Sequence, residues 1–508
     1  MQRTKESVQF GEHTSRPQLS QIPDDETDAV ESSDEIEETE APVVANQDNN
    51  VIIDNEIDEA TDNNNGTRKS NRTKKVPPRI QDCITANDNE VDEDGDLVHF
   101  ALLAGAEPIN YLEAMSNLKW KQAMEEELCA IEKNQTWQLV KLPTGKKAIA
   151  VKWVFKLKLN PDGSVAKHKA RLVARGFLQR EGLDYSEVFS PVARIETVRL
   201  VVAIANANSW PMYHLDVKSA FLNGPLEEVV FVTQPPGFMI TGKENMVYRL
   251  KKALYGLKQA PRAWNKRIDG FLVKQGFSKC KSEYGVYVQK STSSIILICL
   301  YVDDLLVTGS DLAEIKKFKS DMMNEFEMTD LGTISYFLGI EFLNTSKGLM
   351  LHQRKYAGEI LKRFNMTDCT PAITPMETNL KLEKNVDEDA VDPTLFMEDP
   401  RQSHMKAATR VLKYIAGTQD FGILFPKTAK NEILEIVCYS DADWCGDKTD
   451  RRSTTGYFFK FLKAPVAWCS KKQPVVALSS CEAEYIAGAY AACQAISQLE
   501  KCTWSVPT

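Results

Sequence analysis

The chain has 508 residues, 43% of them hydrophobic, and a formal net charge of −9. This length allows more than one domain and a sizeable core, and no apolar run reaches the roughly 18 residues that a membrane-spanning helix needs. The negative charge would argue against a nucleic-acid partner if it were spread evenly. Acidic residues are instead concentrated between Asp24 and Asp96, and the rest of the chain is closer to neutral.

Residues 1–109 are interpreted as a disordered acidic linker, because their few apolar side chains cannot offset the entropy cost of folding. A basic island at Arg68–Arg79 is either part of this flexible linker or a patch for nuclear import or nucleic-acid binding. The first residues lack the apolar segment of a signal peptide, and the eleven cysteines show no zinc-finger spacing. We therefore expect an intracellular protein, cytoplasmic or nuclear, with reduced thiols.

The region after the linker has the mixed pattern of an α+β fold. Helical spacing of apolar residues runs from Leu112 to Asn134. Two strand-like runs flank a turn signal at Asn160–Gly163 and predict a hairpin. The other predicted elements are, in chain order, a strand over 136–142, a helix with Pro191 in its first turn, a strand over 212–222, two apolar strands within 293–309, a helix over 314–328, a helix over 406–417, three strands between 435 and 470, and an alanine-rich helix over 479–500.

Asp303 and Asp304 interrupt the apolar stretch Ile298–Ser310, which reads ICLYVDDLLVTGS. A tight turn between two strands would place them at its tip, and a solvated turn is one interpretation because Asp is a common turn residue. The flanking strands are apolar on both faces, so the hairpin is expected to be covered. Partly buried neighbouring carboxylates must be protonated or neutralised, and a hard divalent cation can neutralise them. Asp216, which follows another apolar stretch, is a third candidate ligand for a two-metal site.

The YVDD box at Tyr301–Asp304 resembles the catalytic box of reverse transcriptases. Further boxes between Trp120 and Phe396 narrow the resemblance to the Pol polyprotein of copia-type LTR retrotransposons. These boxes include KWVFKLK, KARLVARGF, LDVKSAFLNG, YGLKQAPRAW and LGTISYFLGIEF. The resemblance implies RNA-directed DNA synthesis by a right-hand polymerase over residues 110–396, with fingers, palm and the start of the thumb. It also implies two Mg²⁺ or Mn²⁺ ions, an RNA or DNA template with a primer, and deoxynucleoside triphosphates.

The same resemblance gives roles to single residues in the polymerase region. Asp216, Asp303 and Asp304 would be the catalytic metal ligands. Phe221 matches the aromatic residue beneath the incoming sugar, where its ring would exclude a 2′-hydroxyl. The alternative for Phe221 is plain core packing.

Four further residues are candidates for contact with the nucleotide or the primer. Gln259 matches a glutamine that lines the nucleotide pocket. Lys169 and Arg171 lie on a fingers-like strand and would offset the charge of the triphosphate, or they form a solvated basic face. Tyr301 would pack near the primer end, unless it is an ordinary strand aromatic.

Residues 430–508 resemble the RNase H-like α/β domain that follows reverse transcriptase in this family, with Asp441 and Glu484 matching two of its metal ligands. A family segment is missing between Phe396 and Met397, so residues 397–429 are interpreted as a remnant of the connection region. The family's third RNase H aspartate is also not found. We therefore expect a truncated, inactive RNase H-like domain with exposed apolar surface around residues 487–495. The alternative to an active polymerase is a degenerate relic that at most binds nucleic acid.

Overall fold

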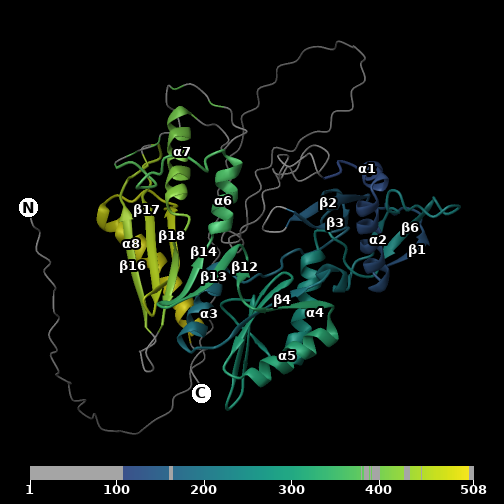
Figure 1. Ribbon diagram of the computed structural model, residues 1–508, viewed down its shortest axis with the longest axis horizontal. Coiled ribbons are helices and arrows are strands. Elements are labelled where there is room, and N and C mark those ends of the chain that lie inside the picture. The colour runs from purple at the N-terminus through teal and green to yellow at the C-terminus, as the bar shows by residue number, and fades with distance from the viewer. Residues whose placement is uncertain are drawn as a thin grey trace, which may run out of the picture. The chain divides into compact units, whose positions relative to one another are not determined.

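The computed structural model describes residues 107–159, 164–378, 401–427, 435–447 and 449–502, with the single residues 380, 382, 388 and 391. Residues 1–106 of the predicted linker, the turn at Asn160–Gly163 and the Phe396–Met397 junction lie outside this description. The described chain mixes helices and antiparallel sheets (Figure 1), which confirms the α+β prediction. None of the described helices is long and apolar enough to cross a membrane.

A long hairpin and the helix α2 that packs against it form the first part of the described chain. The predicted helix over 112–134 is two helices, because Asn117 adopts an extended conformation and its side chain caps the second one. Along β3, Ala170, Leu172 and Ala174 are buried, which leaves Lys169 and Arg171 on the opposite face. The elements are α1 (Tyr111–Ser116), α2 (Leu118–Lys133), β2 (Val151–Leu159) and β3 (Val165–Ala174).

A small three-stranded sheet lies next to this hairpin in the same hydrophobic cluster. Trp137 stacks on Tyr248 across the sheet, with ring centroids 4.0 Å apart. Its strands are β1 (Trp137–Lys141), β5 (Phe231–Val232) and β6 (Met246–Leu250), and the 3₁₀ turn η4 (Gly176–Leu178) follows β3.

The central element is a six-stranded sheet with the strand order β11-β4-β10-β9-β8-β7. Alternate residues of β9 pack against α4 and α5 on one face and against α3 on the other, so the sheet is covered on both faces as its sequence predicted. Its elements are α3 (Ile195–Ala207), β4 (Met212–Val217), η5 (Ala220–Asn223), α4 (Ala260–Lys274), β7 (Ser278–Lys279), β8 (Val286–Lys290), β9 (Ile295–Tyr301), β10 (Asp304–Gly309), α5 (Leu312–Glu325) and β11 (Met328–Thr333).

The predicted position of Pro191 in the first turn of α3 is wrong, because the helix begins at Ile195. The residues just before α3 are extended, and the backbone N–H of Ala193 donates to the carbonyl of Leu300 at 3.1 Å. The N–H of Ala193 is therefore used in a contact with β9, and α3 starts only after this extended segment.

The C-terminal part contains two further sheets. The sheet β12-β13-β14-β15 is joined to the pair of helices α6 and α7, and the sheet β16-β17-β18 is packed against the long helix α8. Their bounds are β12 (Tyr336–Phe337), β13 (Ile340–Thr345), β14 (Gly348–His352), α6 (Arg354–Arg363), α7 (Gln402–Gly417), β15 (Gly422–Pro426), β16 (Ile436–Asp443), β17 (Thr454–Phe461), β18 (Ala464–Lys472) and α8 (Ser480–Cys502).

The expected exposure of apolar surface around residues 487–495 is wrong for Ala487 and Ala491, whereas Ala489, Tyr490 and Ala492 are exposed. Ala487 and Ala491 are buried, because they face the sheet that α8 covers. The exposed apolar side chains of α8 lie on its other side and include Tyr485, which is 82% exposed. The sheet therefore has a covering helix within the described residues.

Candidate active site

The turn between β9 and β10 carries the two adjacent aspartates. Tyr301 pairs with Asp304, so Val302 and Asp303 are the two central residues of a tight hairpin turn. Val302 has a φ of +55°, an uncommon conformation for a β-branched residue. The buried indole of Trp264 on α4 donates to the carbonyl of Val302 at 2.7 Å. This contact holds the strained turn from the α4 side and thereby fixes the backbone next to Asp303.

Asp216 lies beside this turn, near the end of β4. It is directly opposite Asp304 in the antiparallel pairing of β4 and β10, and the backbone N–H of Val217 donates to the carbonyl of Asp303 at 2.8 Å. Burial raises the pKa of the Asp303 carboxyl, and the negative charges of Asp304 and Asp216 raise it further. The structure thus brings the three predicted carboxylates to one end of the sheet, where they repel one another.

Asp304 also has a partner that the sequence analysis did not single out. His214 precedes Asp216 by two residues and lies on the same face of β4, and its Nε2 is 2.7 Å from Oδ1 of Asp304. The imidazole is largely buried and meets the ring of Phe337 edge-on, with centroids 5.2 Å apart. One carboxylate of the three is therefore oriented by a neighbouring side chain.

Carboxylate oxygens such as these are the ligands that a hard divalent cation prefers. Within the described part of the chain, however, no group of three or more His, Cys, Asp or Glu side chains is spaced to hold a metal ion as it stands. Burial raises the pKa of Asp303 and repulsion by Asp304 and Asp216 raises it further, and a bound cation would relieve this repulsion. Asp216 and Asp303 therefore fit the role of shared ligands, while Asp304 faces His214.

Lys169 on β3 lies within electrostatic reach of the Asp303 turn. Burial lowers the pKa of its ammonium, with the charges of Arg171 and Lys158 acting in the same direction, while Asp303 and Glu127 oppose the shift. A partly buried cation that interacts electrostatically with Asp303 is suited to an anionic ligand. The triphosphate role of Lys169 nevertheless stays a prediction.

Arg171 differs from Lys169 because a carboxylate inside the protein compensates its charge. Its Nη1 donates to Oε2 of Glu127 on α2 at 2.8 Å, and Glu127 is only 3% exposed. The backbone N–H of Leu172 also points to Glu127, at 3.4 Å. Arg171 is thus held by α2, and its predicted contact with the triphosphate remains a prediction.

Phe221 lies on η5, five residues after Asp216. Its ring is half-buried, packs against two hydrophobic clusters and lies 4.9 Å from the ring of Tyr255 between centroids. Both interpretations of Phe221, as a contact to the sugar and as core packing, agree with this position. Tyr255 belongs to the YGLKQAPRAW box, but nothing in the sequence marked it as a site residue.

The two remaining candidates lie in different environments. Gln259 is 3% exposed at the start of α4, and its amide oxygen accepts from Nε2 of Gln179 at 3.0 Å while its amide nitrogen donates to the carbonyl of Asp184 at 3.0 Å. Its side chain therefore joins α4 to the loop after η4. Tyr301, in contrast, is 37% exposed at the end of β9, an accessible position beside the turn that carries Asp303.

Comparison with known proteins decides the family of this chain. The family described as "Reverse transcriptase (RNA-dependent DNA polymerase)" matches residues 134–378. The chain is 40% identical over 413 residues to the retrovirus-related Pol polyprotein from transposon RE2 of Arabidopsis thaliana, an alignment that covers 76% of this chain and 28% of that protein. For the corresponding polyprotein from transposon TNT 1-94 of Nicotiana tabacum, the identity is 38% over 421 residues, covering 75% of this chain and 31% of that protein.

A shorter relative is covered almost completely. The putative transposon Ty5-1 protein of Saccharomyces cerevisiae is 30% identical over 302 residues, which is 54% of this chain and 97% of that protein. The chain belongs to the reverse transcriptases of copia-type retrotransposon Pol polyproteins. The match covers less than a third of the length of the two plant Pol polyproteins.

This reverse transcriptase family member also carries the second predicted pair of acidic residues. Asp441 lies on β16, and Glu484 lies near the start of α8. The backbone N–H of Ala442 donates to Oε1 of Glu484 at 3.2 Å, so the helix presents Glu484 to the strand that carries Asp441. No third Asp, Glu, His or Cys side chain joins them within the described residues.

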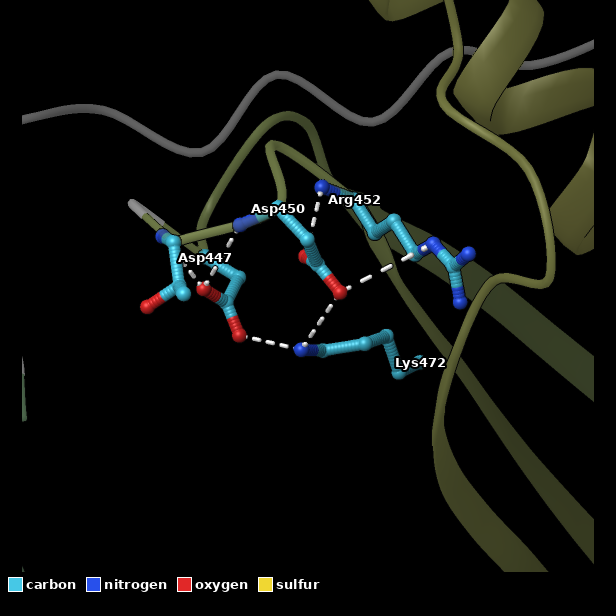
Figure 2. A network of polar contacts seen from close by, with 5 residues as sticks. Asp447, Asp450, Arg452 and Lys472 are labelled. Atoms are coloured by element: carbon cyan, nitrogen blue, oxygen red, sulfur yellow. Dashed lines mark hydrogen bonds and ion pairs between the residues drawn. The ribbon is translucent and has the colours of Figure 1, made fainter. Parts of the chain in front are cut away.

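Two more aspartates after β16 take part in a separate polar network. Figure 2 shows Lys472, at the end of β18, between Asp447 and Asp450, with Arg452 beside Asp450. The Lys472 ammonium pairs with both carboxylates and lowers the pKa of Asp447 to about 2. This network joins the segment between β16 and β17 to the end of β18, so basic residues compensate Asp447 and Asp450.

Proposed function

We propose that the chain is an RNA-directed DNA polymerase that extends a primer on an RNA or DNA template by two-metal nucleotidyl transfer. The observation that carries this proposal is the meeting of Asp216, Asp303 and Asp304 at one end of the central sheet, where burial and the charges of the other two carboxylates raise the pKa of Asp303. Family membership supports it, because the matched family is that of RNA-dependent DNA polymerases.

The side chains of this site have separable tasks. Asp216 and Asp303 would hold Mg²⁺ or Mn²⁺, with Asp304 as the third carboxylate and His214 orienting it. The ions, when bound, would promote deprotonation of the primer 3′-hydroxyl and stabilise the leaving pyrophosphate. Lys169 would offset part of the triphosphate charge. Phe221 would lie beneath the sugar of the incoming deoxynucleotide, and Tyr301 would contact the primer end.

The substitution Asp303→Asn tests this proposal. An amide carries no charge to hold the ions, so metal-dependent primer extension should fall by at least about a thousandfold, the equivalent of several kcal/mol. The same variant should melt at a higher temperature in the absence of metal, because it removes a charge that is partly buried and repelled by Asp304 and Asp216. Asp368→Asn, at an exposed position, is the matched control for both measurements.

Undiminished extension by Asp303→Asn would contradict the role of Asp303 as a metal ligand. A parent chain that binds a primer–template duplex but extends it with neither Mg²⁺ nor Mn²⁺ would support the alternative, a non-catalytic relic. For the RNase H-like part, we infer that Asp441 and Glu484 alone supply too little charge for two cations, so that the 508-residue chain does not cleave RNA–DNA hybrids.

A further inference from the structure

We propose that Tyr255 is a positioning residue that holds the ring of Phe221 and thereby sets discrimination against ribonucleotides. This inference rests on the proposed polymerase function. It extends that function to Tyr255, whose ring contacts Phe221, the residue proposed to lie beneath the sugar. It concerns the step in which the incoming nucleotide is accepted or rejected. Three observations support it, namely the contact between the two rings, the rigid attachment of Tyr255, and the electrostatic influence of Asp303 on Tyr255.

The contact between the two rings is the first observation. Phe221 lies on a 3₁₀ turn of only four residues, and its ring is half-buried. Such a short turn cannot by itself fix the ring. The Tyr255 ring lies 4.9 Å away between centroids, with 51° between the ring planes, and aromatic pairs at this distance attract each other. A ring that rejects a 2′-hydroxyl by steric conflict must not move aside, so a neighbour that holds it affects selectivity.

The attachment of Tyr255 is the second observation. The backbone N–H of Ala174, the last residue of β3, donates to the carbonyl of Tyr255 at 2.8 Å. The next residue, Gly256, has a φ of +86°, and a Cβ at that position would lie 2.2 Å from the carbonyl oxygen of Ala174. Only glycine permits this close approach. The loop that carries Tyr255 is therefore pressed against β3.

The Tyr255 ring also contacts a cation that is itself held in place. The guanidinium carbon of Arg171 lies 5.0 Å from the centroid of the Tyr255 ring, within the range of a cation–π contact. Arg171 is in turn bonded to the buried carboxylate of Glu127. A continuous chain of contacts thus runs from Glu127 on α2 through Arg171 and Tyr255 to Phe221.

The third observation is the electrostatic environment of Tyr255. Burial raises the pKa of Tyr255 to about 12, and the negative charges of Glu127 and Asp303 act in the same direction, although Arg171 opposes them. The phenol is therefore neutral at physiological pH and offers an uncharged ring to Phe221. The negative charge of Asp303 thus acts on the same ring that contacts Phe221.

The test compares four variants of the full chain, namely Tyr255→Leu, Tyr255→Phe, Phe221→Ala and the double variant Tyr255→Leu/Phe221→Ala. The readout is the ratio of kcat/KM for a deoxynucleotide to kcat/KM for the matching ribonucleotide. Tyr255→Leu should lower this ratio by about tenfold, a change in the range that pocket contacts provide. Tyr255→Phe keeps the ring and should retain the parent ratio. Tyr284→Leu, the same substitution at an exposed tyrosine, is the matched control.

The double variant shows whether Tyr255 acts through Phe221. Once the Phe221 ring is absent, loss of Tyr255 should lower the ratio no further, because effects along one chain of contacts are not additive. An unchanged ratio in Tyr255→Leu, or a fully additive loss in the double variant, would overturn the proposal. If circular dichroism shows that Tyr255→Leu does not fold, Tyr255→Met replaces it with the same expectations.

A second measurement separates failure of this inference from failure of the polymerase proposal. A terminated primer on its template, with Ca²⁺ in place of Mg²⁺, should trap ternary complexes whose affinities for deoxy- and ribonucleotide can be compared without turnover. A parent chain that traps neither nucleotide would overturn both proposals. Parent complexes that favour the deoxynucleotide, with the same preference in Tyr255→Leu, would overturn the role of Tyr255 alone.

Discussion

Lys169 and Asp303 belong to different segments of the chain, yet each affects the protonation of the other. Burial lowers the pKa of the Lys169 ammonium and raises the pKa of the Asp303 carboxyl, while their mutual attraction opposes both shifts. Each charge therefore helps to keep the other ionised in a partly buried site. If metal ions compensate the carboxylates, Lys169 is left to interact with the phosphates of a nucleotide.

Lys169→Gln should raise the KM for deoxynucleoside triphosphates by about 10- to 100-fold, the equivalent of the 1.5–3 kcal/mol typical of a charged hydrogen bond. Because burial lowers the pKa of Lys169, its ammonium loses its proton at a lower pH than an ordinary lysine does. In the parent chain, KM should therefore rise as the pH increases through that lowered pKa. Lys169→Arg stays protonated and should show no such rise. Steady-state kinetics across an alkaline pH series checks both expectations.

Lys167→Gln is the matched control for this prediction, because Lys167 is an exposed residue of the same strand that pairs with Glu126. It should leave the KM unchanged. Equal increases in KM for the Lys167 and Lys169 variants would instead support the solvated basic face that the sequence also allowed.

At the scale of secondary-structure elements, the sequence predicted what depends on local pattern. The two apolar strands and the tight turn at Tyr301–Asp304 were predictable because both faces of the central sheet are covered. Helix boundaries that depend on a single side chain or on a distant contact were not predictable. Examples are the break between α1 and α2 at Asn117 and the start of α3 at Ile195. The pairing of β17 with β16 and β18, and the contact of β16 with α8, followed from the predicted strand–helix order only in outline.

The candidate site divides in the same way. The carboxylates were visible as charges within apolar runs, whereas Tyr255 and His214 act through contacts that no local pattern reveals. The burial of Glu127 had one weak signal in the sequence. It lies three residues after Met124 and four before Ile131, on the apolar face of the predicted helix that became the buried face of α2. Its partner Arg171 lies 44 residues away, and only the folded chain shows the pair.

The strand β16 and the helix α8 allow a test of the second pair of carboxylates. We expect no cleavage of an RNA–DNA hybrid by the 508-residue chain with Mg²⁺ or Mn²⁺, because within the described residues only Asp441 and Glu484 are available as ligands. A fluorescent hybrid-cleavage assay measures this, with Glu484→Gln beside the parent. Cleavage that is lost in Glu484→Gln would show that further ligands complete the site, and the inference of an inactive domain would be wrong.

At the scale of the whole described chain, the polymerase sheet and the C-terminal part share one hydrophobic cluster around α3. Two buried cations strengthen this contact. Nε of Arg199 donates to the carbonyl of Val466 at 2.8 Å, and its guanidinium lies 3.9 Å from the ring centroid of Trp468. Lys501, near the end of α8, is 0% exposed, donates to Oγ1 of Thr197 at 2.8 Å and lies 3.7 Å from Glu283. The two parts should therefore unfold together.

Lys501→Met should lower the free energy of unfolding by about 3 kcal/mol, because it leaves the buried carboxylate of Glu283 without its closest cation. Urea denaturation followed by tryptophan fluorescence and by circular dichroism should give one shared, shifted midpoint. The double variant Lys501→Met/Glu283→Gln should recover part of the loss, because it also removes the uncompensated charge.

Lys133→Met removes a cation from an exposed ion pair and should leave the midpoint where it is. An unchanged midpoint in Lys501→Met, or transitions that separate between the two probes in the parent chain, would show that the end of α8 does not stabilise the polymerase sheet.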